Sequence, residues 1–116
     1  MGDQEISRKE NLNPNYERRD IMAVKIFIQR KVKPGKEEAL NEVVRELRSK
    51  AMYAEGFISG ETLQSIEDPS MHLVISTWKS IGAWNKWLKG TYRKEIKKKM
   101  KEVLVGSEKM TSYQYE

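Results

Sequence analysis

Residues 23–51 read AVKIFIQRKVKPGKEEALNEVVRELRSKA, and this stretch decides the fold. Within its first residues Val24, Ile26 and Ile28 alternate with Lys25, Phe27 and Gln29, which is typical of a β-strand with two different faces. The turn over residues 33–36 contains Pro and Gly and ends the strand. After the turn, apolar side chains recur at the spacing of one helical face: Leu40, Val43, Val44, Leu47 and Ala51. The stretch therefore predicts a strand, a tight turn and an amphipathic helix.

The rest of the chain predicts three further strands and a second helical region. The predicted strands are residues 57–66, 71–78 and 107–115. A short turn joins the first two of these into a hairpin. Ser80 is a suitable N-cap for a helix, residues 90–91 interrupt that helix, and a second helical piece continues to Gly106. This order predicts an α+β fold of the ferredoxin-like βαββαβ type, in which two helices cover one face of a four-stranded antiparallel sheet.

Both faces of the predicted sheet carry large apolar side chains. In the first strand Ile26 and Ile28 share one face, whereas Phe27 lies on the other. In the third strand Ile75 lies on the face opposite to Trp78. Two helices can cover only one of these faces. We therefore expect a homodimer in which the second faces of two sheets pack together.

Length and composition narrow the class of protein. The 116 residues are enough for one domain, predicted over residues 22–116, and the polar residues 1–21 predict an N-terminal arm. The chain has no cysteine and a single histidine, His72, so we expect no thiolate zinc site, no iron–sulfur cluster and no other metal site. No apolar run reaches the ~18 residues of a membrane span, and no signal peptide is recognisable. These features predict a cytoplasmic protein with no membrane partner.

The positive charge of the chain is concentrated in one segment. The net charge is +5, and residues 79–101 contain nine Lys or Arg side chains against Glu95 alone. We interpret this segment as the solvated face of the second helical region. RNA-binding sheets of this topology need exposed stacking aromatic residues on their central strands, and Phe27 alone does not meet that need. We therefore predict no nucleic-acid partner.

Three motifs resemble a known family. They are VKIFIQRKVKPGKEEAL (residues 24–40), EGFISGETLQS (residues 55–65) and HLVISTWKSIGAWNKWL (residues 72–88). Together they resemble the antibiotic biosynthesis monooxygenase family of dimeric α+β barrels over about residues 23–105. The resemblance implies a dimeric barrel fold. Members of this family include cofactor-independent oxygenases of anthrones and quinols, and haem-degrading enzymes.

The catalytic residues that the resemblance implies are matched only in part. Trp78 corresponds to a tryptophan that ends the third strand in both kinds of enzyme. In the haem-degrading members, an asparagine of the first strand corresponds to Gln29 and the iron-ligating histidine corresponds to Lys97, which cannot ligate iron when protonated. In the cofactor-independent members, an asparagine corresponds to Val74 and an arginine falls near Lys97. The resemblance thus favours oxygen chemistry without haem degradation.

The sequence leads to one main hypothesis and two alternatives. The main hypothesis is a cofactor-independent monooxygenase that binds a small electron-rich aromatic molecule, of the quinol or anthrone type, between the sheet and the second helical region. Its expected catalytic residues are Trp78, Lys97 and Gln29, and its expected substrate-binding residues are Phe27, Val74 and Trp87. We expect Phe27 and Trp78 to pack on the ring, while Gln29 and Lys97 meet its oxygens. On one helix we expect Trp84 to point into the core and Trp87 to line the rim of the cleft or the dimer contact.

In the two alternative hypotheses these residues have no catalytic role. Trp78 is equally explained as a core side chain, and Gln29 and Lys97 as solvent-facing polar side chains. The chain would then be a non-catalytic dimer that binds a hydrophobic small molecule or haem, or a structural dimer whose arm, residues 1–21, contacts a partner.

Overall fold

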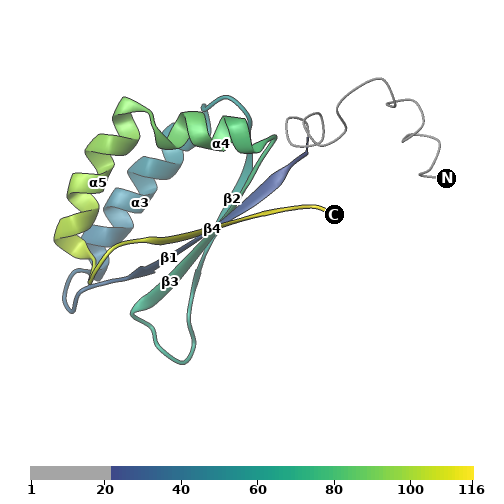
Figure 1. Ribbon diagram of the computed structural model, residues 1–116. Coiled ribbons are helices and arrows are strands. Elements are labelled where there is room, and N and C mark those ends of the chain that lie inside the picture. Colours follow the sequence, from purple (N-terminus) through teal and green to yellow (C-terminus); the bar gives the residue numbers. More distant parts are fainter. Residues whose placement is uncertain (1–21) are drawn as a thin grey trace, which may run out of the picture.

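The computed structural model describes residues 22–116, which form one antiparallel sheet with helices on a single side (Figure 1). The strands are β1 (Val24–Lys31), β2 (Phe57–Gln64), β3 (Met71–Trp78) and β4 (Lys109–Gln114). The helices are α3 (Glu37–Ala51), α4 (Ile81–Leu88) and α5 (Thr91–Val103). The predicted α+β, ferredoxin-like fold is confirmed, with its second helical region divided into α4 and α5. The predicted arm, residues 1–21, lies outside the described residues.

The register of the strands decides which side chains face the helices. The strand order is β2-β3-β1-β4, and β1 pairs with both β3 and β4. Val24 pairs with Trp78, and Ile28 pairs with Val74. Because paired residues of antiparallel strands point to the same face, Trp78 and Val74 share the helix-covered face with the buried side chains of β1. Phe27 pairs with Ile75 on the opposite face.

Local sequence signals place the ends of the helices. The Ser80 hydroxyl accepts a hydrogen bond from the backbone N–H of Ala83 at 3.1 Å, so this serine caps α4 as predicted. The predicted interruption at residues 90–91 separates α4 from α5. Helix α3 ends at Ala51, several residues before Gly56, which has a φ of +86° in the connection to β2. Gly56 also lies so close to Ala83 that a Cβ on the glycine would be only 2.5 Å from that side chain.

Two groups of buried side chains form the core. One lies between β1, β3 and α4 and contains Val24, Ile26, Ile28, Trp78 and Trp84. The other joins the helices to the far end of β1 and contains Val32, Leu40, Leu47, Ile96, Met100, Val103 and Leu104. Trp87 packs against both groups. The core therefore lies on one side of the sheet, under the helices.

The opposite face of the sheet has no helix on it in Figure 1. The rings of Phe27 and Tyr113 meet there edge to face, with their centroids 5.2 Å apart. All six residues of β4 are exposed, and Leu63 of β2 is also exposed. Within residues 22–116, the helices are too short or too polar to cross a membrane.

Candidate active site

A cavity of about 300 Å³ lies between the helix-covered face of the sheet and the helices. Its floor comes from β1, β2 and β3, and its walls come from α3, α4 and the start of α5. The apolar and aromatic lining residues include Ile28, Val44, Leu47, Phe57, Val74, Trp78, Trp84 and Trp87. Arg30, Arg93 and Ser76 also line it. The cavity thus combines an extended aromatic surface with two buried cationic side chains.

Trp78 is the centre of the aromatic surface. Only 1% of this residue is exposed, and its ring meets Phe57 and Trp84 edge to face at centroid distances of 5.3 and 5.5 Å. Trp87 stacks on it at 6.1 Å with an interplanar angle of 29°. The indole N–H of Trp78 donates to the Ser76 hydroxyl at 3.1 Å. The one polar atom of this ring is therefore satisfied within the protein.

Trp84 and Trp87 of α4 both contribute to this aromatic surface, in line with the expectation of a core residue and a residue at the cleft. Trp84 is buried as predicted, and Trp87 is half-buried, yet both rings lie against Trp78 and both line the cavity. Residues three apart lie on the same side of a helix, so the spacing of the two tryptophans is compatible with one shared target. The aromatic surface is consequently larger than the sequence alone suggested.

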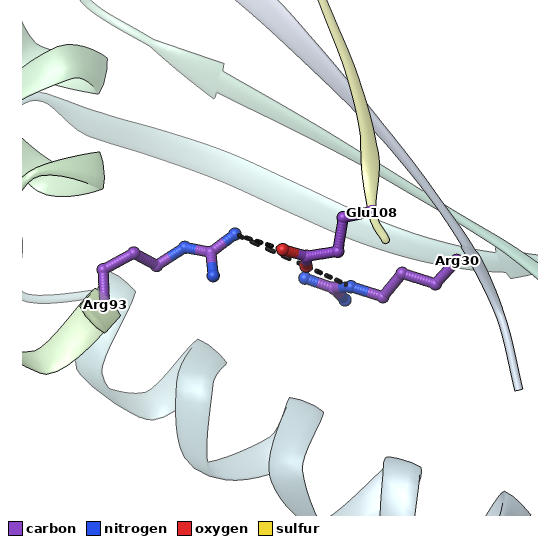
Figure 2. Close-up of polar contacts among 3 residues, drawn as sticks. All are labelled: Arg30, Arg93 and Glu108. Carbon is purple, nitrogen blue, oxygen red and sulfur yellow. Dashed lines mark hydrogen bonds and ion pairs between the residues drawn. The ribbon is translucent and has the colours of Figure 1, made fainter. Parts of the chain in front are cut away.

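A second feature of the cavity is a buried cluster of two arginines and one glutamate. Figure 2 shows Arg30 from β1 and Arg93 from α5 reaching toward Glu108, which precedes β4. The Arg30 Nε donates to Glu108 Oε2 at 2.7 Å, and the Arg93 Nη2 donates to Oε1 at 3.4 Å. Burial lowers the pKa of the Arg30 guanidinium, Glu108 raises it, and the neighbouring Arg93 lowers it further. Because an arginine guanidinium is protonated throughout the physiological pH range, Arg30 remains a cation despite its burial.

The sequence interpretation missed both arginines, although a signal for each was present. Arg30 continues the alternation of Ile26 and Ile28 toward the helix-covered face. Arg93 precedes Ile96 by three residues and therefore extends the buried stripe of α5. The interpretation of residues 79–101 as a solvated face does not hold for Arg93, of which only 4% is exposed. The same periodicities that predicted the core would have placed both charges inside.

The predicted site residues do not all come together. Trp78, Val74 and Trp87 line the cavity. Phe27 and Gln29 alternate with its lining residues and lie on the other face of the sheet. Lys97 is exposed on α5 and lines a separate hollow together with Glu108. The expectation that Phe27 and Trp78 pack on one ring in one cleft is therefore wrong, and Gln29 and Lys97 do not reach that cleft.

The described residues offer no obvious metal centre. Within residues 22–116, no three His, Cys, Asp or Glu side chains gather at one place. His72 lies at the start of β3, beside Arg30 in the strand register. The side chains of the cavity can hold a flat apolar ring against the tryptophans and present two guanidinium groups beside it.

The comparisons agree with this architecture. Residues 23–99 match the antibiotic biosynthesis monooxygenase family, and the chain belongs to that family. No curated protein matches the chain at a significant level.

Solved structures with the same fold come from several organisms. A conserved protein from Methanosarcina mazei Go1 is 22% identical, with a TM-score of 0.77, and the match covers 83% of this chain and 95% of that one. SnoaB, a cofactor-independent oxygenase from Streptomyces nogalater, was solved as a mutant and is 12% identical, with a TM-score of 0.70. That match covers 78% of this chain and 90% of SnoaB. At these identities the likeness establishes the fold.

Proposed function

We propose that this protein is a cofactor-independent monooxygenase that acts on a small electron-rich aromatic molecule. The observation that carries the proposal is the aromatic cavity of about 300 Å³ between sheet and helices, in a chain of the antibiotic biosynthesis monooxygenase family. SnoaB, whose fold is similar, is described as a cofactor-independent oxygenase. The tryptophan that the sequence singles out, Trp78, lines this cavity and contacts the rings of Trp84 and Trp87.

The cavity supports a substrate of limited size. Small-molecule sites in proteins span roughly 300–1,000 Å³, so this cavity lies at the lower end of the range. The rings of Trp78, Trp84 and Trp87 form an apolar surface against which a flat ring can stack. One to three fused rings suit such a space better than a large macrocycle. Val74, four residues before Trp78 on β3, also lines the cavity.

The proposed chemistry takes its electrons from the substrate. A quinol or anthrone that loses a proton becomes an electron-rich anion that can reduce O₂ directly. At an activated CH₂ group, one oxygen atom forms the new carbonyl, and the other leaves as water with the two hydrogens of the CH₂. The protein's part is to bind the ring, exclude bulk water and stabilise the negative charge that develops on the substrate oxygen.

We further propose that two copies pack through the open faces of their sheets, as the sequence predicts. Phe27 and its neighbour Tyr113 lie on that face, and Ile75 pairs with Phe27 there. Such aromatic and aliphatic side chains on a face without helices suit a contact between two copies. In this arrangement Phe27 and Gln29 belong to the dimer contact, whereas Trp78 and Trp87 belong to the substrate cavity.

The experiment is oxygen uptake by the purified protein with a panel of hydroquinones, naphthalene diols and anthrone. We expect uptake above the rate of spontaneous oxidation with at least one of them. Trp87→Leu should lower that rate about tenfold or more, because it removes one ring of the binding surface. Tyr53→Leu is the matched control, because Tyr53 is 89% exposed and does not line the cavity.

The same assay separates the proposed oxygenase from a binding protein. If an aromatic ligand quenches the fluorescence of the cavity tryptophans but no panel compound consumes oxygen above background, the chain binds small molecules without oxidising them. Uptake that is equal in wild type and Trp87→Leu would contradict the assignment of the cavity as the active site.

A further inference from the structure

The buried cluster beside the aromatic surface contains more positive than negative charge. Arg30 and Arg93 share Glu108 as their ionic partner, and the exposed fractions of the two arginines are only 2% and 4%. Both arginines line the cavity, whereas Glu108 lines the neighbouring hollow together with Lys97. An unbalanced charge is costly in a buried site, because solvent cannot compensate it. The excess positive charge therefore borders the space that a ligand would fill.

Two hydrogen-bond donors of this cluster are unused. The Arg30 Nη2 and the Arg93 Nε are both buried, and neither has a hydrogen-bond partner within residues 22–116. Buried donors on charged groups are normally satisfied, so unpaired ones indicate an absent partner. The unused donors come from different elements, β1 and α5, and lie on side chains that flank the same carboxylate (Figure 2). Each of them is available to a second anion in the cavity that both arginines line.

We infer that the cavity binds aromatic molecules that carry a carboxylate, and that Arg30 and Arg93 bind this carboxylate. The inference rests on the proposed function for the use of the cavity and names the class of ligand. The planar fork of a guanidinium matches a carboxylate in shape, and hydrogen bonds between the two charged groups are stronger than those between neutral groups. With the ligand's carboxylate added to that of Glu108, two carboxylates would face the two arginines, and the charges of the cluster would balance. The ring of the same ligand would lie on the tryptophan surface that borders the cluster.

Binding of a matched pair of probes tests this inference without any turnover. The probes are 2-naphthoate and 2-naphthamide, which have the same ring and nearly the same shape but differ in charge, and neither is a quinol. We expect isothermal titration calorimetry to give at least about tenfold tighter binding of naphthoate to the wild-type protein, the lower end for a charge-assisted hydrogen bond. Equal affinities, tighter binding of the amide, or no binding of either probe overturns the inference.

One pair of variants assigns the preference to the cluster. Arg93→Met leaves Arg30 and Glu108 as a balanced pair, so we expect it to fold and to lose most of the preference for naphthoate. Lys94→Met removes a charge from the next residue, which is exposed on the same helix, and should keep the preference. A preference that falls equally in both variants would assign the effect to the general positive charge of α5 and overturn the role of Arg93. The comparison of probes on the wild-type protein decides the inference even if Arg93→Met does not fold.

The outcomes separate this inference from the proposed function. Preferred binding of naphthoate with no oxygen uptake by any quinol, including quinols that carry a carboxylate, would leave the carboxylate site intact and refute the oxygenase. Oxygen uptake by neutral quinols, together with equal binding of the two probes, would support the oxygenase and refute the carboxylate site.

Discussion

Removing the glutamate of the buried cluster should destabilise the protein much more than removing one of its arginines. Glu108 is the ionic partner of both Arg30 and Arg93, at 2.7 and 3.4 Å. The isosteric change Glu108→Gln leaves two buried cations facing each other with no counter-charge. Breaking a buried ion pair in this way costs about 3–5 kcal/mol. We expect the free energy of unfolding to fall by about that amount.

Arg93→Met should cost less, because Arg30 and Glu108 remain as a neutral pair. The bonds that it removes are long, 3.4 and 3.5 Å, so we expect a loss near the lower end for hydrogen bonds to charged groups, about 1.5 kcal/mol or less. The change also removes a like charge from beside Arg30. Charge balance therefore predicts a clear order of stabilities, in which Arg93→Met lies between wild type and Glu108→Gln.

Urea unfolding at pH 7, followed by tryptophan fluorescence, measures both values, since Trp78 and Trp84 are buried in the folded protein. Lys94→Met on the exposed side of α5 serves as the control and should lie within about 0.5 kcal/mol of wild type. If Arg93→Met destabilises the protein as much as Glu108→Gln does, the cluster has no excess of positive charge, and the reasoning fails.

Three further predictions concern single residues. Gly56→Ala should lower the free energy of unfolding in urea by about 2 kcal/mol or more, because the φ of Gly56 is +86° and a Cβ there would lie 2.5 Å from Ala83. Gly35→Ala is the control: its φ is +79° but the space around it is open, so it should cost about 1 kcal/mol. Equal losses in the two variants would contradict the close approach of Gly56 to Ala83. Ser80→Ala should lower stability by about 1 kcal/mol, because it removes the cap of α4, and an unchanged urea midpoint would show that the cap contributes nothing. Burial, with a smaller effect of a nearby carboxylate, raises the pKa of Tyr92 to about 12, so Tyr92→Phe should remove the ionisation near that pH from an alkaline absorbance titration. Because its pKa is higher in the folded than in the unfolded chain, its contribution to stability is complete below pH 10 and is lost as the pH rises through 12, and Tyr92→Phe should flatten that fall.

The sequence predicted the faces of individual strands better than it predicted which faces coincide. Alternation along β1 placed Phe27 away from Ile26 and Ile28, and the structure agrees. Alternation within one strand, however, leaves its phase relative to the next strand undetermined, because a shift of one residue exchanges the two faces. The hypothesis therefore joined Phe27 to Trp78 in one cleft, whereas the register pairs Trp78 with Val24 on the opposite face.

A similar limit explains why the sequence pointed to Lys97, and not to Arg93, as the positively charged residue of the site. Lys97 was favoured by its correspondence to functional positions in relatives, yet it is exposed and lies outside the aromatic cavity. Arg93, four residues earlier, faces inward with Ile96 because it shares the buried stripe of α5. A charge within a basic segment is expected to be solvated on average, and only its position in the helical period distinguishes the one that is buried.

The amino-acid sequence by itself determined the order of strands and helices, the capped start of α4 and the side chains of each element that point inward. These properties follow from alternation, helical period and turn chemistry, which act over a few neighbouring residues. Only the tertiary structure decided that residues 30, 93 and 108 meet in one buried cluster and that Trp78, Trp84 and Trp87 form one surface beside it. Such a meeting depends on strand register and on how the helices pack over the sheet, and these are settled by the sum of contacts across the whole domain.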